Sequence, residues 1–294
     1  MIMKEHPKIG MIGTGVMGQS MAGHLLSAGY TVHVYNRTKQ KAEPLLEKGA
    51  VWFDQPGKLA EQSDIVITMV GFPQDVESLY LDSDGILAHA KPGSIVIDMT
   101  TSSPQLAQTI FEHAEQKQIY ALDAPVSGGD VGAREARLSI MVGGERNVFE
   151  AALPIFQKMG RNIVYQGKAG AGQYTKLSNQ IAVASTMIAV AEALVFAEKA
   201  GLDPFEVLRS IESGAAGSWT MSNLGPRMLK GDFAPGFYVK HFLKDLKIAI
   251  EAAEQLGIQL EGLRLAKRLY DQLSAQGESD RGTQVLYQLL KQQG

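Results

Sequence analysis

Short apolar runs rich in β-branched residues alternate with segments of helical period over the first 167 residues. The runs that predict strands are KIGMI, TVHVY, AVWF, DIVITMV, SIVIDM, IYALD, LSIMV and NIVYQ, with the last two at an edge of the sheet. Strands that alternate with helices are typical of a mostly parallel sheet covered on both faces, with a ligand crevice at the carboxyl ends of the strands. We therefore expect an α/β domain over residues 1–167.

The pattern changes over residues 168–294, where no further run is typical of a strand. Helical period is found over residues 173–200, 204–213, 239–256 and 260–276, and a last helix is expected after Gly282. Trp219 and the methionines near it are expected to pack between helices. The sequence thus predicts an all-α C-terminal domain over residues 168–294, joined to the first domain by a long helix.

The stretch Ile181–Ala197 within this long helix is almost uniformly apolar. It is shorter than the ~20 residues that a membrane span requires, and it contains Ser185, Thr186 and Glu192. We expect it to pack in the core and against other subunits, so the sequence favours a homodimer or homotetramer with no membrane contact.

Composition narrows the classes of function. The 28 Lys and Arg residues against 31 Asp and Glu give a net charge of −3, which argues against a nucleic-acid partner. The absence of cysteine excludes disulfides, thiolate nucleophiles and Cys-ligated zinc, and the six histidines show no metal-ligand spacing. The N-terminus does not resemble a signal peptide. We expect a cytoplasmic protein without a metal.

A glycine-rich motif, Gly13-Thr14-Gly15-Val16-Met17-Gly18, joins the first predicted strand to a helix that precedes the second strand. In this βαβ context Gly13 would form the tight turn, Gly15 would admit the pyrophosphate of a dinucleotide, and Gly18 would let helix and strand pack closely. The alternative is a glycine-rich turn without a ligand. The context favours a Rossmann domain in which residues 13–18 contact the cofactor.

The end of the second strand indicates which dinucleotide is preferred. An NAD enzyme usually has an acidic residue there for the ribose 2′-hydroxyl, whereas this chain has Asn36-Arg37-Thr38. Arg37 can bind a 2′-phosphate through charge-assisted hydrogen bonds, and Thr38 can add a hydroxyl. These residues favour NADP over NAD. The alternative is a solvated Arg37 in an enzyme that accepts both cofactors.

Two further segments carry candidate chemistry. DAPVSGG ends a predicted strand, and the Ser127 hydroxyl with the backbone N–H groups of Gly128 and Gly129 would suit a small carboxylate. In GAGQYTKLSNQ, Lys176 lies near the start of the long helix. Asn179 and Gln180 follow at i+3 and i+4, so they share its face of the helix.

Six motifs follow one another in the order IGMIGTGVMG, DMTTSSP, DAPVSGG, GAGQYTKLSNQ, DFAPGF and KDLKIA, within a match that extends from Ile9 to Gly282. In these motifs the chain resembles the β-hydroxyacid dehydrogenase family. The resemblance implies that Lys176 is the catalytic lysine. Asn179 on the same helix face is a second catalytic candidate, with the alternative that it serves only to orient Lys176. The resemblance also implies substrate contacts from Ser127, Gly128, Gly129, Gln180, Phe237 and Asp245, and further cofactor contacts from Val70, Gly71, Thr101 and Lys244.

Some positions depart from the family pattern, and some assignments have plainer alternatives. Asn179-Gln180 replaces the frequent Asn-Asn pair, and His24 replaces a usual Asn in the first helix. Lys244 and Asp245 could form a simple charge pair on a helix, and Phe237 could be a core residue. These alternatives concern fine substrate geometry rather than the catalytic lysine.

The resemblance implies an NAD(P)-dependent oxidoreductase that interconverts a small 3-hydroxy carboxylic acid and its semialdehyde. Candidate substrates are of the 3-hydroxyisobutyrate, tartronate semialdehyde, glyoxylate or succinic semialdehyde type. Hydride transfer to an aldehyde leaves a developing alkoxide, to which a lysine can supply both charge and a proton. A decarboxylating sugar-acid dehydrogenase would need a larger helical domain. A non-catalytic dinucleotide-binding module is the alternative of a different class.

Overall fold

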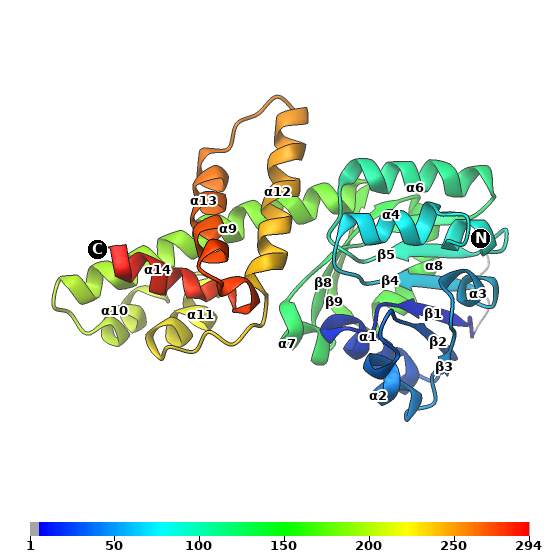
Figure 1. The fold of residues 1–294 in the computed structure, drawn as a ribbon, viewed down its shortest axis with the longest axis horizontal. Coiled ribbons are helices and arrows are strands. Elements are labelled where there is room, and N and C mark those ends of the chain that lie inside the picture. Colours follow the sequence, from blue (N-terminus) through cyan, green and yellow to red (C-terminus); the bar gives the residue numbers. More distant parts are fainter. Residues whose placement is uncertain (1–5, 294) are drawn as a thin grey trace. The chain divides into compact units, whose positions relative to one another are not determined.

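The computed structural model describes residues 6–293 and divides the chain into two compact units, Met1–Lys176 and Leu177–Gly294. All strands of the described residues lie in the N-terminal unit, and the C-terminal unit is helical apart from one isolated bridge between Tyr238 and Gly282. The helix α9 (Ala171–Lys199) runs through the division (Figure 1). The predicted fold class, a Rossmann domain followed by an all-α domain with a long joining helix, is confirmed.

Six parallel strands form the central sheet in the order β3-β2-β1-β4-β5-β6. They are β1 (Ile9–Ile12), β2 (Val32–Tyr35), β3 (Val51–Trp52), β4 (Ile65–Thr68), β5 (Ile95–Asp98) and β6 (Tyr120–Asp123). The direction of the strand order reverses at β1, which lies between β2 and β4. Such a reversal opens a ligand crevice at the carboxyl ends of the strands.

Three further strands extend the sheet beyond β6. Here β8 (Leu138–Gly144) runs antiparallel to β6 and to the short β7 (Val126–Ser127), and β9 (Gly160–Gly167) pairs with β8 in parallel. Each of the eight predicted runs contains a strand. The remaining strand, β7, was not predicted, because two residues are too few to show a hydrophobic pattern.

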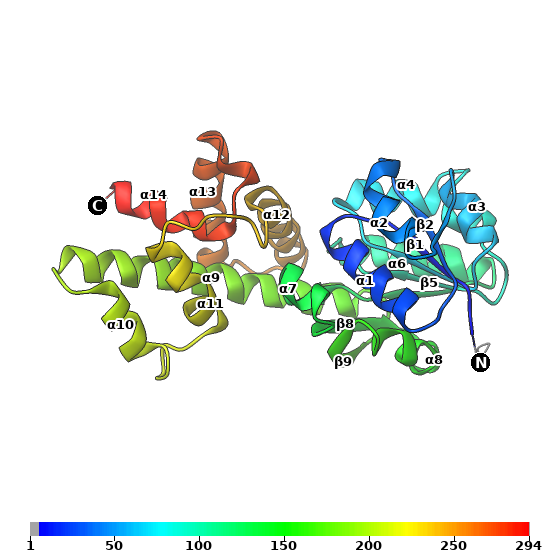
Figure 2. The same ribbon diagram turned by 90° about the horizontal axis from the view of Figure 1, so that it is seen from below.

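Alternate residues of the parallel strands face opposite layers of helices, as the period of two in a strand requires. Ile9 and Met11 contribute to one core with α1 and α8, whereas Ile12 contributes to the other with α3, α4, α5 and α6 (Figures 1 and 2). The helices of this unit are α1 (Val16–Ser27), α2 (Glu43–Leu46), α3 (Pro56–Glu61), α4 (Pro73–Leu81), α5 (Ile86–His89), α6 (Pro104–Gln116), α7 (Gly129–Arg134) and α8 (Arg146–Phe156). Both faces of the sheet are therefore buried.

The C-terminal unit continues from α9 with α10 (Pro204–Ile211), α11 (Trp219–Leu229), α12 (Val239–Gln255), α13 (Glu261–Ala275) and α14 (Leu286–Gln293). Helices α12 and α13 pack together, with the rings of Phe242 and Tyr270 edge to face at 5.0 Å. The sequence did not predict α11, because Pro226 interrupts its pattern; the Ser218 hydroxyl caps its start by accepting a bond from Met221 N.

Trp219 does not pack between helices as expected. Its side chain is 65% exposed, whereas Met221 and Met228 on the same helix are buried. The apolar helix α9 also leaves large side chains exposed, among them Phe196. Of the described helices, α9 is the one whose length and hydropathy would suffice to cross a membrane, a test that the core helix of a soluble protein also passes. Less than half of its most apolar part is buried.

Candidate functional site

The carboxyl ends of four parallel strands lie in register at one edge of the sheet. Ile12, Thr68, Asp98 and Asp123 occupy successive partner positions across β1, β4, β5 and β6. The segments that follow these strands carry most of the residues predicted to bind cofactor and substrate in the N-terminal unit. The register of the sheet therefore brings the glycine loop, the Val70-Gly71 turn and Thr101 to one edge.

The glycine loop has the geometry that each glycine was expected to provide. Gly13 adopts a φ of +96°, and a Cβ at Gly18 would collide with the carbonyl oxygen of Gly13. A Cβ at Gly15, by contrast, would meet no atom within 4 Å. Two of the glycines thus serve tight packing, whereas the backbone at Gly15 faces open space.

This open space suits the pyrophosphate of a dinucleotide. Helix α1 starts directly after Gly15, its N-cap residue, which has no side chain to cap the first N–H groups. The Thr14 hydroxyl is buried and has no hydrogen-bond partner among the described residues. Uncapped N–H groups at the start of a twelve-residue helix attract anions. Val16 is exposed and Met17 half-buried at the same turn.

The segment after β2 places Asn36 and Arg37 in different roles. Asn36 Oδ1 accepts a hydrogen bond from Thr14 N at 3.1 Å, and its Nδ2 donates to Thr38 O. Asn36 therefore fixes the glycine loop to the end of β2. Arg37 is 79% exposed and its Nη1 lies 3.0 Å from Asp75 Oδ1 on α4, so one donor of its guanidinium fork is engaged by a carboxylate.

The segments after β4 and β5 are held to each other by hydrogen bonds. Val70 N donates to Thr100 Oγ1, and Thr100 N donates to Asp98 Oδ1, which also accepts the Thr68 hydroxyl. Thr101 follows directly and is half-buried. These bonds fix the backbone of both segments that were expected to contact the cofactor.

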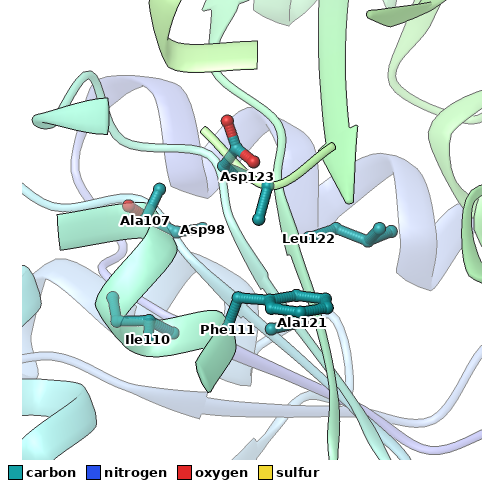
Figure 3. Close-up of a pocket in the computed structure, with 8 residues that line it drawn as sticks. Asp98, Ala107, Ile110, Phe111, Ala121, Leu122 and Asp123 are labelled. Carbon is teal, nitrogen blue, oxygen red and sulfur yellow. The ribbon is translucent and has the colours of Figure 1, made fainter. Parts of the chain in front are cut away.

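Asp123, at the end of β6, holds the start of helix α9. Its two carboxylate oxygens accept hydrogen bonds from Gly170 N and Gln173 N, each at 2.8 Å. Burial raises the pKa of Asp123 to about 7 against the lowering effect of these bonds, and the negative charge of Asp98 raises it further. Figure 3 shows both carboxylates at a small cavity between α6 and β6, with room for about one water molecule.

Lys176 lies on the second turn of α9 and is 7% exposed. Three residues earlier, the side chain of Gln173 is fully buried and binds Thr100 O and Ser102 N. A charged side chain is rarely buried without a specific partner or function. Lys176 is not without a partner in this structure. The structure thus separates Lys176 from an ordinary solvated lysine on a helix surface.

The segment Ser127-Gly128-Gly129 joins the end of β7 to the start of α7. Ser127 is half-buried and pairs with Ser139 of β8, while Gly128 and Gly129 adopt φ values of +131° and +62°. His24 Nε2 on α1 donates to Ala133 O on α7 at 2.9 Å. The helix that follows the glycine loop is thereby tied to the helix that follows the proposed carboxylate site.

Four of the predicted residues form one polar network in the C-terminal unit. Asn179 Nδ2 donates to Gln180 Oε1, and Gln180 Nε2 donates to Asp245 Oδ2 at 2.6 Å. Lys244 Nζ lies 2.9 Å from Asp245 Oδ1, and both side chains are largely buried. Lys244 and Asp245 are therefore not a solvated surface pair. Phe237 is half-buried, and the centroid of its ring lies 5.7 Å from that of Phe242.

Three residues near these segments were not assigned a role from the sequence. They are Asp75, Asp123 and Gln173. Asp123 and Gln173 stand inside motifs that the sequence singles out, but their partners are 47 to 73 residues away in the chain. The sequence offered one sign of their importance. Asp123 is a polar residue at the end of an apolar strand, and Gln173 is a polar residue on an apolar helix.

Known proteins resemble the chain over both units. Residues 8–167 match the family model described as the NAD-binding domain of 6-phosphogluconate dehydrogenase, and residues 170–290 match the one described as NAD-binding of NADP-dependent 3-hydroxyisobutyrate dehydrogenase. An uncharacterized oxidoreductase of Bacillus subtilis, YkwC, is 59% identical over 96% of this chain and 98% of its own length. The probable 3-hydroxyisobutyrate dehydrogenase-like 1 of Arabidopsis thaliana is 49% identical over 97% of this chain and 85% of its own length.

The fold has a similar match among solved structures. The structure of 3-hydroxyisobutyrate dehydrogenase from Mycobacterium tuberculosis with L-serine superposes with a TM-score of 0.90, at 31% identity, over 97% of this chain and 99% of that one. The glycine loop fits a dinucleotide on geometry alone, and both matched family models are described as NAD-binding. The chain therefore belongs to the β-hydroxyacid dehydrogenase family and is an NAD(P)-dependent 3-hydroxyacid dehydrogenase.

Proposed function

We propose that the protein is an NADP-linked reductase of small aldehydes that carry a carboxylate, with Lys176 as the general acid. The observation that carries this proposal is the burial of Lys176 one helical turn beyond a residue bonded to the backbone around Thr101. A buried amine at that position can supply a proton and positive charge to a reacting oxygen. Asn179, three residues further along α9, is proposed as the second catalytic side chain.

The remaining roles follow from the chemistry of each segment. When bound, the nicotinamide would supply the hydride. Residues 13–18 would hold the pyrophosphate, and Val70, Gly71 and Thr101 would contact the rest of the dinucleotide. Ser127 and the N–H groups of Gly128 and Gly129 would bind the substrate carboxylate. Gln180, Phe237 and Asp245 stay predictions as substrate contacts, as does Lys244 as a cofactor contact.

The substrate class is tested by measuring NADPH and NADH oxidation with an aldehyde panel. The panel comprises glyoxylate, succinic semialdehyde, tartronate semialdehyde and methylmalonate semialdehyde, each beside its amide or another neutral analogue. We expect turnover of at least one acid and poor turnover of its neutral analogue. Binding of NADPH or NADH without oxidation of the cofactor by any aldehyde of the panel would instead support a non-catalytic dinucleotide-binding module.

The NADP preference rests on Arg37. The absence of an acidic residue at positions 36–38 leaves no carboxylate for the ribose 2′-hydroxyl at the end of β2. Arg37→Glu removes one charge-assisted contact and adds repulsion, which should cost about 2–3 kcal/mol, or roughly 30- to 150-fold in NADPH affinity. Thr38→Ala is the milder companion variant. Equal affinity of the unaltered protein for NADPH and NADH would contradict this preference.

We further propose that the protein assembles as a homodimer or homotetramer through α9 and its neighbours. Phe196, Leu202 and Phe205 are all exposed at the end of α9 and the start of α10. Large apolar side chains that are exposed so close together in the chain are unfavourable in water and are typical of a subunit contact. Light scattering after size-exclusion chromatography tests this, with Phe196→Glu expected to shift the mass toward the monomer. A monomeric unaltered protein would refute it.

A further inference from the structure

The side-chain amide of Gln173 binds the backbone on both sides of Thr101. Its Nε2 donates to Thr100 O at 2.8 Å, and its Oε1 accepts from Ser102 N at 2.9 Å. These are the two bonds that a neighbouring strand would make to the same segment. Because Gln173 is completely buried, water cannot replace either bond without opening the structure.

The backbone of Gln173 is itself fixed to the sheet. Gln173 N donates to Asp123 Oδ2, and Gly170 N donates to Asp123 Oδ1. Gly172, between them, lies so close to β6 and β8 that a Cβ there would collide with the carbonyl oxygens of Met141 and Asp123. The first turn of α9 therefore has little freedom to shift relative to the strand ends.

Lys176 follows Gln173 by three residues in this same rigid turn. Residues three apart in a helix lie on the same side, about 4.5 Å apart along the axis. The segment around Thr101 is thus bonded to the side chain of Gln173, and the backbone of Lys176 is joined to the backbone of the same residue by the helix. A displacement of Gln173 would change the separation between them.

We propose that Gln173 is a positioning residue, which sets the distance between the Thr101 segment and Lys176. The inference rests on the proposed function, in which Thr101 contacts the cofactor and Lys176 the reacting oxygen. Hydride and proton must reach neighbouring atoms of one carbonyl group, so the two anchored segments must keep their spacing. A misplacement of about 1 Å in such an arrangement can reduce the rate roughly 100-fold.

The first experiment compares Gln173→Met with Gln284→Met. Gln284 is an equally buried glutamine whose Nε2 binds the carbonyl oxygens of Asp232 and Ala234 in the C-terminal unit. Both variants replace a buried amide by a side chain of similar size. The measured quantities are kcat per NADPH-binding site, KM for the aldehyde, and the primary isotope effect on kcat with deuterated NADPH.

For Gln173→Met we expect kcat per binding site to fall roughly 10- to 100-fold, with a larger isotope effect and little change in KM. Gln284→Met should keep kcat within about twofold, because it disturbs the fold without disturbing this spacing. A Gln173→Met enzyme with near-normal kcat would overturn the proposal. An equal loss of kcat in both variants would also overturn it, because general destabilisation would then explain both.

Gln173→Asn keeps the amide but shortens the side chain by one methylene, so it cannot reach both partners from the same backbone position. It provides the test if the methionine variant does not fold. We expect the same loss of kcat at an unchanged KM. An asparagine variant with full activity would show that the spacing does not depend on Gln173.

A measurement without turnover separates this inference from the proposed function. In the unaltered protein, NADPH should slow hydrogen exchange at the amides of residues 170–176, because Gln173 links them to the Thr101 segment. In Gln173→Met this protection should be lost while NADPH still binds. If NADPH binds but no aldehyde is reduced, the proposed function fails. The role of Gln173 is then decided by hydrogen exchange alone, and protection that persists in Gln173→Met would overturn it. Failure of the unaltered protein to bind NADPH would refute both.

Discussion

Asp123 is expected to make the N-terminal unit less stable as the pH rises from about 4 to about 7. Its folded-state pKa is raised from 3.8 to about 7, first by burial and then by the nearby charge of Asp98. Between these two values the folded protein holds a proton that the unfolded chain releases. The stabilisation is therefore complete below about pH 4 and is lost as the pH rises through 7.

The magnitude follows from the size of the shift. A difference of about three pH units, at about 1.36 kcal/mol each, corresponds to about 4 kcal/mol. Asp123→Asn removes the ionisation, although its Nδ2 cannot accept either of the two backbone N–H groups at α9. The variant should be less stable than the unaltered protein at pH 4.5. That deficit should shrink by about 3 kcal/mol as the pH rises from 4.5 to 8, because part of the full effect lies below pH 4.5.

The assay is urea unfolding between pH 4.5 and 8, followed by tryptophan fluorescence. The chain has two tryptophans, so Trp219→Phe in every protein leaves Trp52 of β3 to report on the N-terminal unit. Asp82→Asn, at an exposed position after α4, is the matched control and should parallel the unaltered protein. A constant difference between Asp123→Asn and the unaltered protein over this range would refute the reasoning.

Three further predictions concern the catalytic side chains and the packing of α9. Lys176→Ala should lower kcat by roughly 10²- to 10⁴-fold while NADPH affinity, measured by fluorescence titration, stays the same; Lys176→Arg should rescue poorly because a guanidinium hardly releases a proton. An alanine variant that keeps a tenth of kcat would exclude Lys176 as the main acid. Ser127→Ala should raise KM more than it lowers kcat in steady-state assays, because the Ser127 hydroxyl is proposed to bind a carboxylate that does not react. A larger effect on kcat than on KM would exclude a pure binding role for Ser127. Gly172→Ala should lower the Tm in thermal unfolding, because the added Cβ collides with backbone at a cost of about 1–3 kcal/mol. Gly23→Ala is the control and should raise the Tm slightly, because a Cβ there meets no atom within 4 Å. Equal changes in Tm for the two variants would contradict the close packing of Gly172.

The sequence by itself determined the alternation of strands and helices and the position of the glycine loop. Both are local signals, because continuous apolar runs such as SIVIDM reflect burial on both faces of each strand, and the glycines act within one turn. Even here short elements were missed. The two residues of β7 are too few to show a period, and Pro226 concealed α11, where the cap by Ser218 decides the helix start.

Only the tertiary structure decided what the polar residues contact. Asn36 serves to hold Thr14, and Arg37 meets Asp75, which is 38 residues away in the chain. Gln173 looks in the sequence like one more polar residue on a helix, yet it binds backbone more than 70 residues away. Hydrophobic periodicity states which face of an element is buried, but it carries no information about which distant donor meets which acceptor. That choice is made when the strand ends come into register, and it decides how the candidate site is held together.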